Sequence, residues 1–369
     1  MNVCVIGGGN IGTAIAAIMN QNGHEVYIKT RRPEQWSKTI CYTDMESQKS
    51  FSAHISKITH DSKILAICDI VLITTPTFTL KNILDEIKPH LKKSTPIGII
   101  PGTGGVEFIA KNMIEEGHII FGLDRVPCIA RVTKYGKNVS GLKKHSVRLC
   151  AFPKHKTSQL CDIIQDLFQL HCFPLDNYLT VTFTPSNPIL HTTRLYAMYQ
   201  NAAPTHSWKE NVLFYEAWDD LSSQMLIACD TELQAVCKAI NKLDLTGVVP
   251  LTTHYESHTI QAMTHKISNI LSFKGITSPM IQKNGRYVFD LNSRYFTEDF
   301  PYGLCIIKGF AEIFSCKTPN IDIILQWYQH ISGQMYFTKT GFNGPDLTKT
   351  AIPQNFGIHT KEDVYTFYQ

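Results

Sequence analysis

A glycine-rich turn lies between a short apolar segment and a helical pattern at the start of the chain. Residues 2–6 are apolar enough for a buried strand, Gly-x-Gly-x-x-Gly follows at 7–12, and small apolar residues then recur at helical spacing. In such a unit the glycines permit a tight turn, a close approach of pyrophosphate, and close packing of helix on strand. The sequence therefore predicts a Rossmann-type dinucleotide site, at a helix N-terminus that favours anions. Its residues would be Gly7, Gly9, Asn10, Ile11 and Gly12.

The end of the second predicted strand indicates which dinucleotide binds. An NAD site usually has an acidic residue there, about 20 residues after the glycines, to hold the ribose 2′-hydroxyl. Residues 25–29 are typical of this strand, and Thr30, Arg31 and Arg32 follow it, with Lys38 shortly after. Guanidinium groups would bind a 2′-phosphate that a carboxylate would repel. We therefore expect NADPH, with NADH less favoured; the alternative is a solvated basic turn.

Strand and helix patterns alternate through the first half of the chain. Buried-strand runs at 67–74, 97–100 and 146–150 are separated by segments with helical spacing. This alternation predicts a parallel, doubly wound sheet. Such sheets bind ligands at the carboxyl ends of their strands, so we also expect Thr75 and Pro76 in the cofactor site.

The pattern changes at the proline-rich segment 184–188, after which long helical patterns dominate. A chain of 369 residues is long enough for two domains. We predict an α/β fold, with a Rossmann-type NAD(P)-binding domain over 1–185 and a mainly α-helical substrate domain over 186–369. The clearest helical pattern spans about 218–243, and the glycines and prolines after Phe337 predict a largely irregular tail.

Composition argues against several classes of partner. The net charge is only +4, with acidic and basic residues interspersed, so neither nucleic acid nor an anionic membrane is expected. No apolar run is long enough to span a bilayer, and the first strand leaves no room for a signal peptide. The 11 scattered cysteines form no Cys-x-x-Cys pair, which indicates reduced thiols and no metal framework. We expect a cytoplasmic protein without a metal; the sequence leaves open whether it forms a homodimer.

His191 is a candidate acid–base residue in the second half. Asn187 and Pro188 are typical of a helix start, so we expect His191 in the first turn of a helix that directly follows the hinge. The positive end of that helix would disfavour the imidazolium ion, leaving a neutral base near pH 7. The chain has 15 histidines, however, and on spacing alone a packed or surface histidine is the more common case.

Arg294 and Asp299 are candidates for binding charged groups. Arg294 would hold a substrate carboxylate in a bidentate pair, and Asp299 would lie near an ammonium or an imidazole. Helical periodicity resumes shortly after them, so Glu298 and Asp299 could equally satisfy the N–H groups of a helix start, with Arg294 paired to one of them. The residues alone leave both interpretations open.

In combination, these features resemble the opine dehydrogenases of the octopine/nopaline dehydrogenase family. The resemblance extends over about residues 1–330 and depends on several motifs together. These are the glycine turn, the segment 187–191, the pair Arg294 and Asp299, and the shorter segments 125–137 and 317–319.

The resemblance implies a reductive condensation. The amino group of an amino acid attacks an α-keto acid, and hydride from the nicotinamide reduces the imine. The family's catalytic histidine, arginine and aspartate correspond to His191, Arg294 and Asp299. Because the imine is readily hydrolysed, we expect the reaction in a closing interdomain cleft that excludes water.

The basic end of the second strand departs from the NADH-selective animal members of the family. Arg32 and Lys38 match in spacing a basic pair of the bacterial metallophore-making branch, such as staphylopine and pseudopaline dehydrogenases. The amino substrate is therefore left open between a plain amino acid and a larger aminocarboxylate.

Two other functions stay as alternatives. An NADPH reductase similar to ketopantoate reductase or glycerol-3-phosphate dehydrogenase would share the glycine turn, the basic strand end and a helical second domain. Such enzymes use a lysine of the second domain as proton donor, whereas the first lysine after the hinge here is Lys209. A regulatory protein that binds NADPH without turnover is the other alternative, and the set of His191, Arg294 and Asp299 argues against it.

Overall fold

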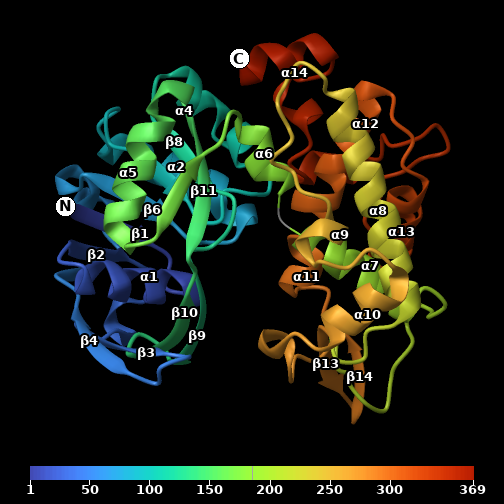
Figure 1. Ribbon diagram of the computed structural model, residues 1–369, viewed down its shortest axis with the longest axis horizontal. Coiled ribbons are helices and arrows are strands. Elements are labelled where there is room, and N and C mark those ends of the chain that lie inside the picture. Colours follow the sequence, from blue (N-terminus) through green and yellow to red (C-terminus); the bar gives the residue numbers. More distant parts are fainter. Residues whose placement is uncertain (185) are drawn as a thin grey trace. The chain divides into compact units, whose positions relative to one another are not determined.

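The chain divides into two compact units, Met1–Phe183 and Thr184–Gln369 (Figure 1). The structure is a computed structural model, and it describes residues 1–184 and 186–369. The domain boundary expected from the sequence falls at Pro185, which lies outside the described residues, so that boundary stays a prediction.

An eight-stranded sheet forms the centre of the first unit. Neighbouring strands are parallel except β8 and β11, which pair antiparallel. Across the sheet the order is β12 (His171–Pro174), β11 (Ser146–Phe152), β8 (Ile120–Leu123), β7 (Ile97–Ile99), β6 (Ile70–Ile73), β1 (Asn2–Ile6), β2 (Glu25–Lys29) and β5 (Lys57–Thr59).

The Rossmann-type α/β fold class is confirmed, whereas the expectation of a wholly parallel sheet is wrong at β11. Parallel neighbours need a crossover connection, usually a helix. Between β8 and β11 the chain forms two strands of another sheet instead, and it returns in the opposite direction.

The direction of strand progression reverses between β1 and β6. The chain moves from β1 to β2 on one side and from β6 to β7 on the other. Right-handed crossovers therefore place α1 (Asn10–Gln21) and α2 (Leu80–Ile87) on opposite faces of the sheet. The carboxyl ends of β1 and β6 lie side by side at this reversal, which is where doubly wound sheets bind ligands.

Four further helices complete the first unit: α3 (Val106–Ile109), α4 (Lys111–Glu115), α5 (Thr157–Phe168) and α6 (Tyr178–Phe183). The segment of helical spacing that follows β7 thus forms two short helices, α3 and α4.

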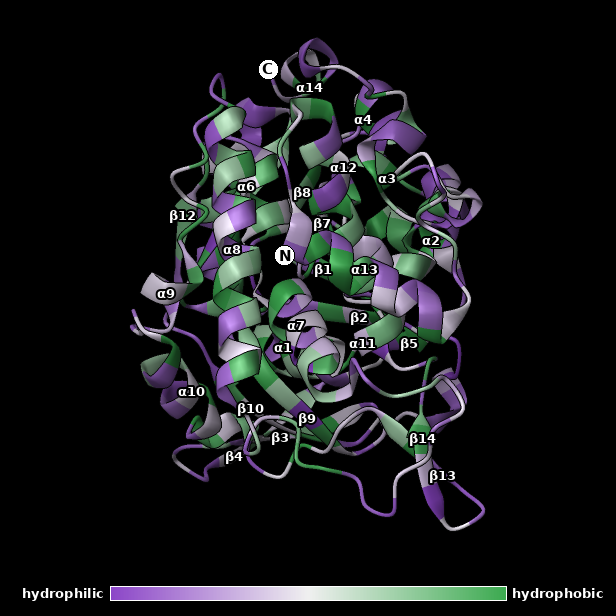
Figure 2. Ribbon diagram, turned by 90° about the vertical axis from the view of Figure 1, so that its right-hand side faces the viewer, coloured by the Kyte–Doolittle hydropathy of each residue, from purple (hydrophilic) through white to green (hydrophobic). Residues whose placement is uncertain are grey.

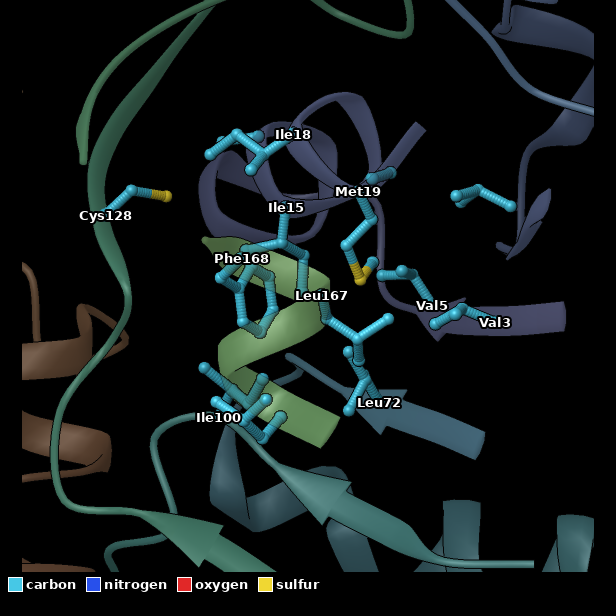
Figure 3. Close-up of a cluster of buried hydrophobic side chains, with 14 of the residues drawn as sticks. Val3, Val5, Ile15, Ile18, Met19, Leu72, Ile100, Cys128, Leu167 and Phe168 are labelled. Carbon is cyan, nitrogen blue, oxygen red and sulfur yellow. The ribbon is translucent and has the colours of Figure 1, made fainter. Parts of the chain in front are cut away.

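The core of this unit lies between β1, α1 and α5. Figure 3 shows Ile15 and Met19 of α1 beside Val5 of β1, with Leu167 and Phe168 of α5 packed below them. All five side chains are fully buried, and burying each apolar side chain of this size stabilises a fold by about 1.5–3 kcal/mol. In Figure 2, β1 and β7 are correspondingly hydrophobic.

A second, four-stranded sheet packs on α1 and was not predicted from the sequence. Its order is β4 (Ser50–His54), β3 (Thr39–Asp44), β10 (Asn138–Lys143) and β9 (Cys128–Lys134). The central pair, β3 and β10, is parallel and joins segments that are far apart in the sequence, so no local pattern indicates it.

The second unit is mainly helical, as expected. Its helices are α7 (Asn187–Tyr199), α8 (Asp220–Ala239), α9 (Leu251–His254), α10 (Ile260–Ser268), α11 (Arg294–Thr297), α12 (Cys305–Phe314), α13 (Pro319–Ser332) and α14 (Lys361–Tyr368), and it also has a hairpin of β13 (Met280–Lys283) and β14 (Arg286–Phe289). The helix predicted over about 218–243 is α8, whose hydrophobic and hydrophilic patches alternate along its length (Figure 2).

The expectation of an irregular tail is wrong at α14. This helix begins with a capping box, in which Thr360 and Asp363 each accept a hydrogen bond from the other's backbone N–H. In the part of the chain that the structure describes, no helix combines the length and the apolar character needed to cross a membrane.

Arg194 of α7 is fully buried and ties this helix to the segment that leads into α8. Its guanidinium donates hydrogen bonds to the carbonyl oxygens of Phe214 (2.8 Å) and Ala217 and to the Ser222 hydroxyl (2.9 Å). The Asp219 carboxylate lies 3.3 Å from the same group. Because the planar fork offers five donors in fixed directions, this one side chain fixes the path of residues 214–222.

We expect Arg194→Met to lower the free energy of unfolding of the second unit by about 3–5 kcal/mol, because it leaves buried carbonyl groups without donors. Arg286→Met is a matched control, since exposed Arg286 also bonds a neighbouring segment, through Ser207. Urea unfolding of the full chain measures both changes. Equal losses in the two variants would contradict the role given to Arg194.

Candidate active site

The glycine turn after β1 has open space for a side chain at Gly9 but none at Gly12. Gly7 has a φ of +115°, a conformation that favours glycine. A Cβ at Gly12 would lie 2.0 Å from the Gly7 carbonyl oxygen, so α1 packs against the turn itself. A Cβ at Gly9 would meet nothing within 4 Å. Gly9 is also the N-cap of α1 and supplies no side-chain acceptor to its first N–H groups. This open cradle at a helix N-terminus fits the pyrophosphate of a dinucleotide.

Three predicted cofactor segments meet at this turn. In the parallel register, Ile6 of β1 pairs with Lys29 of β2 and with Ile73 of β6. Thr30 and Thr75 therefore follow strand ends that flank Gly7, and Pro76 comes next. A Cβ at Gly7 would lie 3.1 Å from the Thr75 methyl group. The Thr75 hydroxyl is buried and has no hydrogen-bond partner among the described residues, so it is available to a ligand.

The side chains of Asn10 and Ile11 have structural roles. The Asn10 amide oxygen accepts a hydrogen bond of 2.9 Å from the Val132 N–H and so anchors β9. Ile11 packs against the hydrophobic core. Their predicted contribution to cofactor binding would therefore come from the backbone N–H groups of the first helical turn.

The basic residues at the end of β2 are exposed. Within the described ranges, the side chains of Arg31, Arg32 and Lys38 form neither an ion pair nor a hydrogen bond. Three cationic groups thus lie close together in the sequence with no protein anion to neutralise them. Thr30, by contrast, is buried, with its hydroxyl 3.5 Å from that of Tyr135.

Trp36 and Tyr135 lie against the glycine turn at Gly8, and the sequence did not indicate Trp36 as a site residue. Their rings meet edge to face at 5.6 Å, and a Cβ at Gly8 would lie 2.6 Å from Trp36. A Cβ at Gly136 would lie 2.8 Å from the Trp36 backbone, so Gly136 lets β9 and β10 approach this ring closely. The only sequence signal was an aromatic residue directly after the basic turn.

His191 and Asp299 form a hydrogen-bonded pair in the second unit. His191 Nδ1 lies 2.7 Å from Asp299 Oδ2, and both side chains are largely buried, at 12% and 13% exposed. The helix start expected from Asn187 and Pro188 is confirmed, since α7 begins at Asn187 with Ser186 as its N-cap. His191 lies in the first turns of α7.

The Asp299 carboxylate does not cap the helix that follows it. Residues Phe300–Leu304 form a π-helical turn that receives no side-chain cap from Asp299. A Cβ at Gly303 would lie 2.5 Å from the Pro188 side chain, so this glycine lets the turn pack against the start of α7. That close approach brings Asp299 to His191, and it separates the two interpretations that the sequence left open.

The Tyr215 hydroxyl lies 2.8 Å from the other ring nitrogen of His191, Nε2. The sequence did not predict this residue, because it lies in an irregular segment without periodicity or a motif. Burial, followed by the neighbouring Tyr295, raises the pKa of the Tyr215 phenol well above its ordinary value, so the group is a neutral phenol near pH 7.

Arg294 begins α11 and is exposed. In the part of the chain that the structure covers, its guanidinium makes no hydrogen bond or ion pair, so it does not pair with Glu298 or Asp299. Its neighbour Tyr295 has its ring 4.4 Å from the His191 ring. The structure thus brings His191 and Asp299 into contact and leaves a free guanidinium one residue from the tyrosine that packs on His191.

Two family models match the chain. Residues 174–332 match "NAD/NADP octopine/nopaline dehydrogenase, alpha-helical domain", and residues 3–132 match "Ketopantoate reductase PanE/ApbA". The second match covers only the dinucleotide-binding part, whereas the first covers His191, Arg294 and Asp299.

Similar proteins match over nearly the whole chain. Tauropine dehydrogenase of Arabella iricolor is 27% identical, over 98% of this chain and 98% of its own length. Octopine dehydrogenase of Mizuhopecten yessoensis is 26% identical, over 99% and 98%. A solved structure of octopine dehydrogenase with NADH and L-arginine has a TM-score of 0.86 at 23% identity and covers 99% of this chain and 98% of that one, so the two share a fold.

Two glycines of the turn should respond differently to the same substitution. Gly12→Ala should lower the free energy of unfolding by about 1–3 kcal/mol, because its Cβ would meet backbone atoms that cannot move aside. Gly9→Ala should change it little, since the space there is open. Urea unfolding of both variants tests this difference, and a loss at Gly9 as large as that at Gly12 would rule out the open cradle.

Proposed function

This chain belongs to the octopine/nopaline dehydrogenase family of NAD(P)-dependent oxidoreductases, and on that premise we propose the reaction that it catalyses. It is an opine-type dehydrogenase acting on CH–NH bonds, and it joins an amino acid to an α-keto acid by reductive condensation. The observation that supports this assignment most strongly is the His191–Asp299 pair, which lies within the part of the chain matched by the helical-domain model.

His191 would transfer protons in the condensation. An ionised carboxylate only accepts hydrogen bonds, so Asp299 holds the proton on Nδ1 and leaves Nε2 of the neutral ring as the base. The condensation needs a base to free the amine from its ammonium form and an acid to protonate the leaving hydroxyl. One imidazole performs both tasks in turn.

Arg294 would bind a substrate carboxylate. Both substrates carry this group, and the planar guanidinium binds it through two parallel hydrogen bonds. Arg294 is exposed and its guanidinium has no partner among the residues that the structure describes, which supports this role because no such ion pair would need to break.

The cofactor would be NADPH, which when bound supplies the hydride that reduces the imine. The Gly7–Gly12 turn would hold the pyrophosphate, with Thr75 and Pro76 at its edge. Arg31, Arg32 and Lys38 would hold the 2′-phosphate, since they are exposed, their side chains are unpaired within the described part of the chain, and no acidic residue ends β2. The family description names both NAD and NADP, so the preference for NADPH depends on these basic residues.

A substrate screen tests the proposed reaction. Each amino acid, and a set of larger aminocarboxylates, is mixed with NADPH and with pyruvate, 2-oxoglutarate or glyoxylate, and loss of the reduced nicotinamide absorbance is followed. Consumption that requires both an amine and a keto acid supports an opine dehydrogenase. Consumption with a keto acid alone indicates a reductase similar to ketopantoate reductase. Binding without consumption in every mixture indicates a regulatory protein.

Removing the two arginines after β2 should weaken the binding of NADPH and not that of NADH. Arg31→Ala with Arg32→Ala should raise the KM for NADPH at least about tenfold and leave that for NADH nearly unchanged, because each lost charge-assisted contact costs about 1.5–3 kcal/mol. Lys63→Ala with Lys92→Ala is the matched control, because it removes the same charge from the segments that lead into the amino ends of β6 and β7. Arg31 and Arg32, by contrast, follow the carboxyl end of β2. The control should change neither the KM for NADPH nor that for NADH. A wild-type enzyme that prefers NADH would contradict the assignment.

The three predicted catalytic residues should give three different kinetic effects. His191→Ala should lower kcat by about 10²–10⁴-fold with NADPH binding intact, as expected for a general acid–base. Arg294→Lys keeps the charge but loses the planar fork, so it should chiefly raise the KM of the keto acid or the amino acid. Asp299→Asn should lower kcat and alter the pH profile. Steady-state kinetics across pH measure all three.

Melting temperatures of the same variants serve as the control for folding. If His191→Ala keeps more than about a tenth of wild-type kcat, His191 is not the proton-transfer residue. If Asp299→Asn lowers only the melting temperature, Asp299 has a structural role alone.

A further inference from the structure

Both ring nitrogens of His191 are occupied in the free protein. Asp299 holds Nδ1 at 2.7 Å and the Tyr215 hydroxyl holds Nε2 at 2.8 Å. Because the proton of the neutral ring is on Nδ1, Nε2 is an acceptor and Tyr215 donates to it. The nitrogen that must exchange protons with the substrate is therefore the one that Tyr215 covers.

We propose that Tyr215 is a proton-relay residue, and that protons pass between His191 Nε2 and the bound substrate through the Tyr215 hydroxyl. This inference rests on the proposed function, since it concerns the path of the protons in that reaction. The competing path is direct transfer from Nε2, with Tyr215 displaced by the substrate.

The surroundings of Tyr215 oppose its displacement. The side chain is only 4% exposed, and its ring stacks on Phe273 with a centroid distance of 4.1 Å. Arg194 bonds the carbonyl oxygens of Phe214 and Ala217, which bracket Tyr215 in the sequence. Moving the hydroxyl away from His191 would require breaking a buried network, which costs more than passing a proton through it.

A second tyrosine, Tyr295, lies beside His191. The Tyr295 ring lies 4.4 Å from the His191 ring, and Tyr295 directly follows Arg294. The residue beside the guanidinium that would anchor a substrate carboxylate therefore packs on the same imidazole whose Nε2 bonds to Tyr215. A relay must deliver its proton close to that anchor, and this arrangement satisfies the requirement.

Protons balance in both directions of the relay. First the substrate ammonium gives a proton to the Tyr215 oxygen while the phenolic proton moves to Nε2, and the free amine attacks the keto carbon. After a proton shift from nitrogen to oxygen within the adduct, Nε2–H returns its proton to Tyr215 as the phenolic proton moves to the adduct's hydroxyl. The C–O bond then breaks, water leaves, and the nitrogen lone pair forms the C=N bond. His191 and Tyr215 end as they began, ready for hydride reduction of the imine.

Tyr215→Phe removes the hydroxyl and keeps the stacked ring. We expect kcat to fall about 10²-fold or more, with the KM for NADPH unchanged. In mixtures of light and heavy water, kcat of the wild type should depend on the deuterium fraction in the way expected when two protons move in one step. The variant should lose this dependence. Tyr365→Phe is the matched control, since Tyr365 is equally buried and also donates one hydrogen bond, to Asn241, yet should keep wild-type kcat.

Two results would overturn the relay. One is a Tyr215→Phe variant that keeps more than about a tenth of wild-type kcat, which means that Nε2 reaches the substrate directly. The other comes from ¹⁵N NMR of the full chain, which reports the His191 tautomer without any turnover: a ring that is not protonated on Nδ1, or an Nε2 shift that marks a free nitrogen, shows that Tyr215 does not bond to it. By contrast, a wild-type enzyme that does not require both an amine and a keto acid to consume NADPH contradicts the proposed reaction itself.

Discussion

The hydrogen bond between His191 Nδ1 and Asp299 Oδ2 is the interaction on which the arrangement of the candidate site, and the chemistry proposed for it, depends. It joins residues 108 positions apart, one in the first turns of α7 and the other just before a π-helical turn. The bond is geometrically allowed because Gly303 has no side chain to hold that turn away from Pro188. It fixes which ring nitrogen carries the proton, and in the proposed reaction it would thereby decide which nitrogen exchanges one with a substrate.

The sequence predicted those parts of the fold that are determined locally. The β1–turn–α1 unit, β2 and α8 follow from apolar periodicity and from glycine placement within short windows. The antiparallel direction of β11 and the pairing of β3 with β10 could not be predicted in this way, because each depends on contacts between segments far apart in the chain. The helix α14 could not be predicted in this way either, because the glycines and prolines that precede it are typical of turns and irregular structure.

The residues of the candidate site likewise differ in whether the sequence could indicate them. His191, Arg294 and Asp299 were found through a family resemblance, whereas their local sequence supported a structural interpretation equally well. Only tertiary packing shows that the Asp299 carboxylate bonds to His191 and does not cap a helix. Tyr215 and Arg194 carried no sequence signal at all, since a tyrosine in an irregular segment and an arginine on a helix are both ordinary. Their importance comes from burial and hydrogen bonding, which a single sequence does not encode locally.

The most direct test of this account is the identity of the product. The protein is incubated with NADPH carrying deuterium at the transferable position, one keto acid and the amino acid that supports the fastest consumption, and the products are analysed by mass spectrometry. The account predicts a secondary amine that joins the two substrates, with one deuterium on the former keto carbon. A deuterated hydroxy acid formed from the keto acid alone would contradict it, because the acid–base pair of His191 and Asp299 would then serve carbonyl reduction and not condensation.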